Sequence, residues 1–265
     1  MKVRIFQVDA FTAEPFRGNP AGVCPLQKAA PDSWMQAVAA EMNLSETAFF
    51  WKEAKGFFIR YFTPLTEVPL CGHATLASAH MLWEENIVPD HAEITFISKS
   101  GILRARSEGV WNCLDFPAYP VKEAQLPSGL AEAIGAKQYS AHSTELGGYL
   151  IELQSEVEVE TLNPDFTQLR RHAFGKIIVT ARSQSESYDF VSRFFWPEGG
   201  VDEDPVTGSA HCSLGPFWAE RLGKTDLVGH QLSKRGGVVR VRALGDRVEI
   251  LGQAVTVIRG EIVIG

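Results

Sequence analysis

Residues 57–77, FFIRYFTPLTEVPLCGHATLA, match residues 190–210, FVSRFFWPEGGVDEDPVTGSA, without a gap. The identical pairs are Phe57/Phe190, Arg60/Arg193, Phe62/Phe195, Pro64/Pro197, Val68/Val201 and Ala77/Ala210. Each copy runs from an aromatic-rich strand through a proline and an acidic loop to a turn of small residues and an apolar helix. The match predicts that the chain is a duplication of one structural unit. Two unrelated strand–loop–helix units remain the alternative.

The helix that follows each matched loop is apolar on nearly every side. One helix is expected from about His73 to Glu85 and the other from about Thr207 to Leu222. A helix that is apolar all round is enclosed by the rest of its fold. The flanking segments are rich in β-branched and aromatic residues. Each half is therefore predicted to be a curved, mostly antiparallel sheet rolled around a central helix, so that the chain is an α+β protein of two pseudo-symmetric halves.

The remaining segments complete this outline. Strands are expected at 3–11, 47–52, 57–62, 93–98, 102–107, 176–181, 189–195, 237–243 and 247–257, and a separate amphipathic helix at 31–43. Two prolines in LDFPAYP, residues 114–120, are expected to interrupt both sheet and helix. The predicted halves are therefore residues 1–117, with Glu46 and the Cys71 helix head, and residues 118–265, with the Asp204 helix head.

Composition and charge narrow the possible partners. The net charge of −7 and the absence of a lysine- and arginine-rich run argue against nucleic acid or an anionic membrane as the main partner. No apolar run approaches the roughly 20 residues that span a bilayer. The first residues, MKVRIFQVDAF, are typical of a strand and not of a signal peptide. A cytoplasmic protein that binds neither nucleic acid nor membrane is expected.

The two helix heads, CGHAT and TGSA, have the composition of anion sites. The N-terminus of a helix leaves backbone N–H groups without partners and carries a partial positive charge. Gly72 and Gly208 let an anion approach the backbone, and Ser209 adds a hydroxyl donor. The alternative is that Thr207 or Ser209 only caps its helix. The duplication predicts that both heads face one central cleft.

Two carboxyl groups accompany the helix heads. Asp204 precedes Pro205, whose ring fixes the local backbone, and is predicted to be aimed at the second head. Glu46 stands between Ser45 and a run of strand formers, where apolar neighbours would raise the pKa of its carboxyl group toward the range of a general acid and base. A solvated loop charge, a surface strand start and, for His73, a purely structural role are the alternatives.

Several other chemistries find no support in the sequence. The four cysteines are scattered, so neither a disulfide framework nor a zinc knuckle is indicated. His73 and His80 are seven residues apart and have no further ligand in their segment, so no metal is predicted. A G-x-S-x-G elbow, a P-loop and a G-x-G-x-x-G turn are all absent. No nucleotide or other cofactor is expected.

Four ordered motifs resemble the phenazine-biosynthesis PhzF-like isomerase family, a branch of the diaminopimelate-epimerase-like fold. They are DAFTAEPFRGNPAGV (9–23), NLSETAFF (43–50), RYFTPLTEVPLCGHATLASAH (60–80) and DPVTGSAHCSLGPFW (204–218). The resemblance covers most of the chain. It implies two pseudo-symmetric halves with the active site between them, a homodimer, and an isomerase that moves a proton between ring carbons without metal, nucleotide or organic cofactor.

The resemblance also assigns roles to individual residues. The glutamate of the SET motif, here Glu46, would be the general acid and base, assisted by His73 and Asp204. The residues that would hold the carboxylate of a small metabolite are Ser45, Gly72, Gly208 and Ser209. Asn19 and residues around Tyr149 are candidates for the pocket wall.

The related racemases and epimerases use two cysteines, one at each helix head. This chain has Cys71 at the first head but Asp204 at the second, and Cys212 lies about two turns inside the helix. A two-thiol racemase is therefore disfavoured and a shuttle through Glu46 is preferred. A non-catalytic module for ligand binding or protein interaction remains the alternative from another class, and the identity of the substrate and the role of Cys71 stay open.

Overall fold

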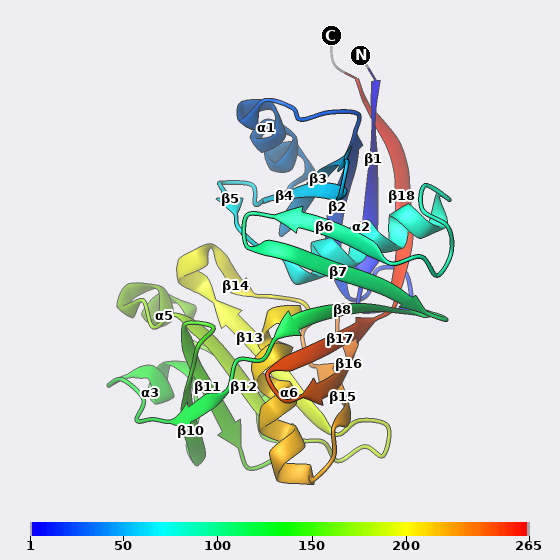
Figure 1. Ribbon diagram of the computed structural model, residues 1–265. Helices are drawn as coiled ribbons and strands as arrows, with labels where there is room; N and C mark the ends of the chain where they lie inside the picture. Colours follow the sequence, from blue (N-terminus) through cyan, green and yellow to red (C-terminus); the bar gives the residue numbers. More distant parts are fainter. Residues whose placement is uncertain (1, 264–265) are drawn as a thin grey trace. The chain divides into compact units, whose positions relative to one another are not determined.

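A computed structural model describes residues 2–263 and divides into two compact units. Unit 1 holds the residues up to Asp115 together with those from Leu251 onward, and unit 2 is Phe116–Ile250. The division lies close to the expected boundary after residue 117, but the end of the chain belongs to unit 1 and not to an uninterrupted second half. The reason is the strand β18 (Ala254–Val263), which pairs antiparallel with β1 (Lys2–Ala10) along its whole length (Figure 1).

Unit 1 is a mostly antiparallel sheet with two helices. Its strands, besides β1 and β18, are β2 (Asn19–Leu26), β3 (Glu46–Glu53), β4 (Gly56–Phe62), β5 (Glu67–Val68), β6 (Ile94–Ser98), β7 (Gly101–Glu108) and β8 (Trp111–Pro117), and its helices are α1 (Asp32–Met42) and α2 (Gly72–Glu84). The pairs β2–β3 and β4–β6 of this unit are parallel. The strand β8 runs across the boundary into unit 2.

The helix α2 is the core of unit 1. Its residues from His73 to Ala79 and from Met81 to Trp83 are all buried. It contacts β1, β2, β3 and β18, and these strands bend around it (Figure 1). An apolar surface on every side of a helix is stable only when such a shell removes it from water. The expectation of a central helix inside a curved sheet is confirmed for this half.

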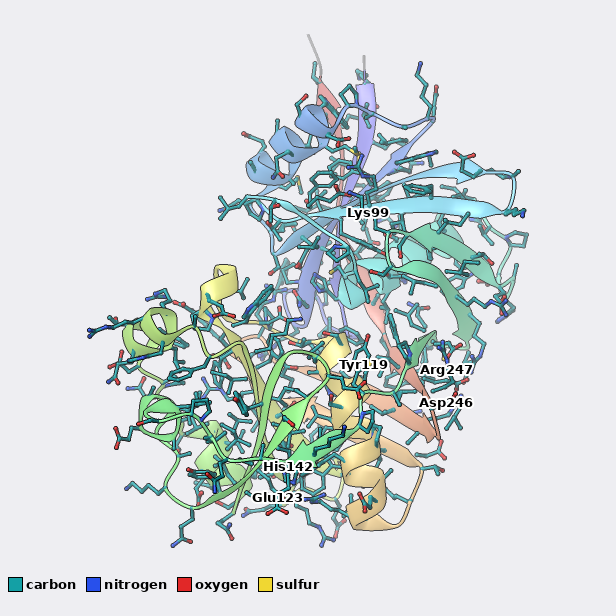
Figure 2. All side chains as sticks on the ribbon, turned by 60° about the vertical axis from the view of Figure 1, so that its left-hand side comes forward. Lys99, Tyr119, Glu123, His142, Asp246 and Arg247 are labelled. Carbon is teal, nitrogen blue, oxygen red and sulfur yellow. The ribbon has the colours of Figure 1, made fainter. Side chains whose placement is uncertain are left out.

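Unit 2 has the same composition of elements with three additional short helices. Its strands are β9 (Val121–Glu123), β10 (Tyr139–Thr144), β11 (Gly148–Leu153), β12 (Lys176–Arg182), β13 (Phe190–Trp196), β14 (Val201–Glu203), β15 (Asp226–Gln231), β16 (Gly237–Leu244) and β17 (Arg247–Gly252), of which the last two residues of β17 already belong to unit 1. Its helices are α3 (Leu130–Ile134), α4 (Glu156–Glu160), α5 (Phe166–His172), the 3-10 turn η1 (Pro197–Gly199) and α6 (Gly208–Leu222). The short strand β9 adds to the edge of β10, with Glu123 opposite His142 (Figure 2).

The helix α6 is the core of unit 2 and packs on β15 and β16. A Cβ atom at Gly215 would come within 2.6 Å of the Val241 side chain on β16. The missing side chain at this position therefore lets the helix lie directly against the sheet. Leu214, Phe217 and Trp218 are buried around it. This half also has the expected central helix.

The pairing of the strands repeats from one unit to the other. The antiparallel pair β1–β2, the parallel pair β2–β3 and the antiparallel pair β3–β4 correspond to β10–β11, β11–β12 and β12–β13. The parallel pair β4–β6 and the antiparallel pair β6–β7 correspond to β13–β15 and β15–β16. The register of the next short pair differs, because Phe62 lies opposite Glu67, whereas Phe195 lies opposite Glu203, three residues beyond the counterpart of Glu67 in the sequence match. The expected α+β fold of two similar halves is confirmed.

Several details differ from the sequence expectation. The segment 247–257, expected to be one strand, is divided at Gln253 into β17 and β18. The prolines of residues 114–120 interrupt the sheet where this was expected, since β8 ends at Pro117. The structure also contains elements that were not expected at all, namely the strands β2, β5, β8, β9, β10, β11, β14 and β15 and the helices α3, α4 and α5. Within residues 2–263, no helix is long and apolar enough to cross a membrane.

Candidate active site

The carboxyl group of Glu46 stands at the first position of β3. The preceding helix α1 ends at Met42 and is followed by the C-cap residue Asn43, whose left-handed backbone (φ 50°) turns the chain through Ser45 into the strand. Glu46 pairs with Ala21 of β2. The five residues that follow it are buried, whereas 19% of its own side chain is exposed. The strand thus presents a partly accessible carboxylate at the edge of an apolar core.

The first turn of α2 is stabilised by two buried hydroxyl groups that are hydrogen-bonded in series. Cys71 is the N-cap residue, with an extended backbone and no side-chain capping bond. The hydroxyl of Thr75 donates to the carbonyl of Cys71 at 2.7 Å. Tyr61 is fully buried on β4, and its hydroxyl lies 2.6 Å from that of Thr75, to which it can donate. These bonds fix the first turn of the helix and with it the position of His73.

The imidazole of His73 contacts three polar groups of unit 1. Its Nε2 atom lies 3.3 Å from the Glu46 carboxylate. Its Nδ1 atom lies 3.2 Å from the amide nitrogen of Asn19 and 3.4 Å from the sulfur of Cys71. The structure therefore brings the predicted residues Glu46 and His73 together, with Cys71 beside them.

Burial decides the charge of this histidine. Desolvation lowers the pKa of His73 to about 3, so the ring is neutral near pH 7. The contact with Glu46 is then not an ion pair, although the distance alone would allow one. An amide N–H of Asn19 directed at Nδ1 requires an acceptor there, which places the ring proton on Nε2, facing the carboxylate. His73 is in this way a neutral donor next to Glu46.

Asn19 is the residue of this site whose role sequence reasoning missed, since it was considered only as pocket wall. It is fully buried at the start of β2. The preceding Gly18 has φ +62°, and a Cβ atom there would lie 2.1 Å from the carbonyl oxygen of Ala10. Only glycine fits this close return of the chain. The Gly-Asn pair in RGNP was the available signal.

The head of α6 carries the other predicted residues, all in unit 2. The hydroxyl of Thr207 donates to the Asp204 carboxylate, and the Thr207 amide donates to the Gln231 side chain at 2.9 Å. The amide group of Gln231 also donates to the Asp204 carbonyl at 2.7 Å. The helix begins at Gly208 and has no side-chain capping bond. Gln231 is a second residue of the helix heads that the sequence analysis missed.

Asp204 is therefore fixed at the second head, as the proline next to it suggested. Gly208 is buried, and Ser209 follows it in the first turn of the helix. Gly72 opens α2 in the same way. That the two heads share one substrate stays a prediction.

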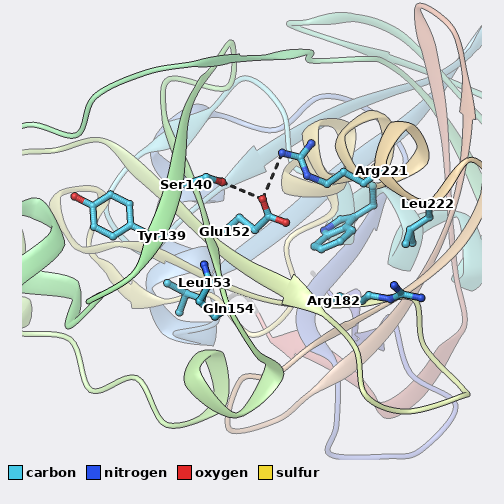
Figure 3. A pocket seen from close by; sticks show the side chains of 9 residues that line it. Tyr139, Ser140, Glu152, Leu153, Gln154, Arg182, Arg221 and Leu222 are labelled. Atoms are coloured by element: carbon cyan, nitrogen blue, oxygen red, sulfur yellow. Dashed lines mark hydrogen bonds and ion pairs between the residues drawn. The ribbon is translucent and has the colours of Figure 1, made fainter.

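A surface pocket of about 490 Å³ lies elsewhere in unit 2 and is not this site (Figure 3). It is lined by Arg221 and Leu222 at the C-terminal end of α6, about 20 Å along the helix from its head. In Figure 3 the carboxylate of Glu152 accepts a hydrogen bond from Ser140 and pairs with Arg221 at 3.3 Å. The carboxylate of Glu152 in this pocket is thus already bound by Ser140 and Arg221.

Comparison with known proteins gives consistent matches. Residues 8–260 match the family model for phenazine biosynthesis-like protein (PhzC-PhzF). An uncharacterized isomerase of Halalkalibacterium halodurans is 50% identical over 265 residues, with 100% of both chains covered. An uncharacterized isomerase of Pseudomonas aeruginosa is 48% identical over 263 residues, with 99% of both chains covered. The crystal structure of a PhzF family phenazine biosynthesis protein from Enterococcus faecalis has a TM-score of 0.93 at 40% identity, with 100% of both chains covered.

Proposed function

Because the chain belongs to the phenazine biosynthesis-like family and is an isomerase of the PhzF-like type, we propose that its Glu46 moves a proton between two carbons of a small carboxylated substrate. One observation carries the proposal, namely the contact between a partly exposed carboxylate and a buried neutral imidazole. Neither a metal ion nor an organic cofactor has a part in the proposed reaction.

The neutrality of His73 suits a carboxyl group that must both take and return a proton. A cationic partner would hold Glu46 in its ionised form and make it a poor base. The neutral ring donates one hydrogen bond and leaves the carboxylate able to be protonated during the reaction. Glu46 is therefore the proposed general acid and base, and His73 is the proposed positioning residue.

The substrate carboxylate is assigned to the helix heads. Gly72 opens α2 without a side chain, and no capping side chain occupies the amide groups of its first turn. The head of α6, with Gly208 and Ser209, is proposed as the second anchor, and Asp204 as a partner for a hydroxyl or amino group of the substrate. Ser45, next to Glu46, is proposed to contact the substrate as well.

Hydrogen exchange with deuterated solvent tests the proposal. The full-length protein is incubated in D₂O with small carboxylated compounds, including an aromatic amino-hydroxy acid, and the labelled carbon is located by NMR. Glu46→Gln should lower the exchange rate about 10²–10⁴-fold while binding of the carboxylate remains nearly intact. Glu53→Gln, the same change at the far end of β3, is the matched control and should keep the wild-type rate. A wild-type rate in Glu46→Gln would exclude the shuttle.

The same experiment separates the alternatives. An isomerase places deuterium on a carbon other than the one that lost hydrogen, whereas a racemase labels the same carbon and inverts it. A protein that only binds its ligand gives no exchange above the buffer rate with any compound. The asymmetry of the two helix heads, with Cys71 at one and Asp204 at the other, favours the isomerase.

Two further expectations stay predictions, namely the homodimer, which the family resemblance implies, and the cytoplasmic location, which was expected from the sequence itself. Light scattering on the eluted protein in solution measures the first, and fractionation of the source cells measures the second. Both results are independent of the reaction.

A further inference from the structure

We propose that Glu46, Cys71 and His73 also form a binding site for a thiophilic divalent cation such as Zn²⁺, and that an ion bound there stops the isomerase reaction. One ligand atom from each residue lies within 4.8 Å of the other two. The set of a thiolate, an imidazole and a carboxylate is one that zinc prefers. The blocking of the reaction rests on the function proposed above, whereas the binding of the metal does not.

The distances between the ligand atoms suit a tetrahedral ion. Bond lengths of about 2.0–2.3 Å place a nitrogen and an oxygen ligand about 3.3 Å apart, and a nitrogen and a sulfur ligand about 3.6 Å apart. The structure has Nε2 of His73 3.3 Å from the Glu46 oxygen and 3.9 Å from the Cys71 sulfur. The sulfur must therefore move a few tenths of an ångström closer to Nε2, and it lies within 4.8 Å of the Glu46 oxygen. The fourth position goes to water, which enters from the exposed side of Glu46.

The state of the histidine also favours a metal. The ring is neutral near pH 7, so no positive charge must be removed from it before it binds. Its proton must move from Nε2 to Nδ1 to free the lone pair that faces Glu46 and Cys71. Asn19, 3.2 Å from Nδ1, can rotate its amide by half a turn and accept that proton with its oxygen. Asn19 can thus accept the hydrogen bond that a metal-bound His73 donates from Nδ1.

The charges balance when the thiol ionises. Two anionic ligands, Glu46 and the Cys71 thiolate, neutralise the divalent ion, and the thiol proton is released to solvent. The helix N-terminus opposes a cation by about 1 kcal/mol, which is less than the attraction of the two anions. One proton is released for each ion bound.

The test titrates the full-length, metal-free protein with Co²⁺ as a spectroscopic substitute for zinc. Binding should give the visible bands of tetrahedral cobalt together with the near-ultraviolet band of cobalt–thiolate charge transfer. Cys71→Ser should lose the charge-transfer band and bind at least about tenfold more weakly. Cys24→Ser removes another buried thiol and should keep both the band and the affinity. A charge-transfer band that persists in Cys71→Ser would overturn the site.

Asn19→Asp gives a second test that needs the thiol in place. A carboxylate at this position accepts a proton from Nδ1 and so holds the Nε2 lone pair ready for the metal. Cobalt should bind about 10–100-fold more tightly to this variant. Weaker binding to a folded Asn19→Asp protein would contradict ligation through Nε2.

Inhibition is measured separately. Zn²⁺ should stop solvent exchange in the wild-type protein, a chelator should restore it, and Cys71→Ser should be resistant relative to its own metal-free rate. If no compound shows exchange, the proposed reaction is wrong. The cobalt spectra then still show whether the metal site exists. If exchange occurs and Zn²⁺ binds without slowing it, the blocking role is wrong.

Discussion

The two helix heads lie at corresponding places in the two units but carry different side chains. Thr47 lies opposite Phe62 in unit 1, and Ile177 lies opposite Phe195 in unit 2. Since Phe62 and Phe195 are counterparts in the duplication, the residue that corresponds to Glu46 is Lys176. The strand β3 therefore begins with an acid where β12 begins with a base.

The neighbours of the two residues differ as well. Ala21 lies opposite Glu46 and Gly148 lies opposite Lys176, so the position of Asn19 corresponds to that of Leu146. His73 corresponds in the sequence match to Val206. The set Asn19, Glu46 and His73 thus becomes Leu146, Lys176 and Val206. The ammonium group of Lys176 already has a hydrogen-bond partner within unit 2, because it donates to the Leu146 carbonyl at 3.1 Å.

The difference separates what the duplicated scaffold requires from what the chemistry requires. Both units keep an arginine on the fourth strand of the repeat, Arg60 or Arg193, in a two-pronged bond with Glu67 or Glu203. In both, the arginine lies over the ring of a phenylalanine two residues further along. The scaffold contacts are retained in both units, whereas Glu46 and His73 are replaced by Lys176 and Val206 at the corresponding positions of unit 2. This asymmetry favours a single general base over two.

The largest expected effect comes from making unit 1 resemble unit 2 at the helix head. His73→Val removes the donor next to Glu46 and should lower the rate of solvent exchange about 10²–10³-fold, the usual loss for a positioned donor. The control is Lys176→Met, at the counterpart of Glu46, which should leave the exchange rate near that of the wild type. If Lys176→Met were as damaging as His73→Val, the chemistry would not be confined to unit 1.

A smaller effect concerns stability. Here the larger loss is expected in unit 2 and not in unit 1, because unit 2 depends more on its arginine. Nη1 of Arg193 donates to the carbonyls of Val159 and Leu162 at 3.3 and 2.8 Å. The corresponding extra partner of Arg60 is Asp32, whose side chain is 75% exposed. Arg193→Met should therefore cost about 2–3 kcal/mol of unfolding free energy.

Arg60→Met is the matched variant in unit 1 and should cost about half as much, since the bond to an exposed carboxylate contributes little. Urea unfolding followed by circular dichroism measures both. Equal losses would show that the bonds from Arg193 to the two carbonyls contribute nothing to the difference.

The sequence predicted the elements whose local pattern agrees with their final environment. Aromatic and β-branched runs identified β3, β4, β12 and β13, and the apolar surface of α2 and α6 identified the two central helices. The strand β2 was missed because Pro20 and Pro25 argue against a strand that has neighbours on both sides. Those neighbours, β1 and β3, are nevertheless present.

The site was predictable in part. Glu46 and His73 could be selected from their motifs, but their contact joins residues far apart in the chain and depends on the register of β3 beside α2. The pairing of Asn19 with His73 spans a still longer separation. Nor could the burial of His73, which sets its pKa, be deduced from the sequence around it. Side-chain identity is local, whereas protonation state and contact depend on tertiary packing.

The smallest difference is expected in a property that the two units share, the burial of a histidine on each central helix. Desolvation lowers the pKa of His73 to about 3 and that of His211 on α6 to about 4. As the pH falls below the ordinary value of about 6.5, the unfolded chain takes up a proton that the folded chain does not. Stability is therefore lost on acidification, by about 1.4 kcal/mol per pH unit for each histidine, until the folded pKa is reached.

Unfolding by urea at pH 7.5 and at pH 5.5 measures this loss. His73→Val and His211→Val should each reduce the acid-induced loss of unfolding free energy by about 1.4 kcal/mol, and by the same amount, because pH 5.5 lies above both folded pKa values. The comparison uses the change with pH and not the absolute stability, so a cavity left by either substitution cancels. A reduction confined to one variant would mean that the other histidine is protonated in the folded protein at pH 5.5. For His73 that outcome would restore an ion pair with Glu46 in this pH range and remove the argument for a neutral donor there.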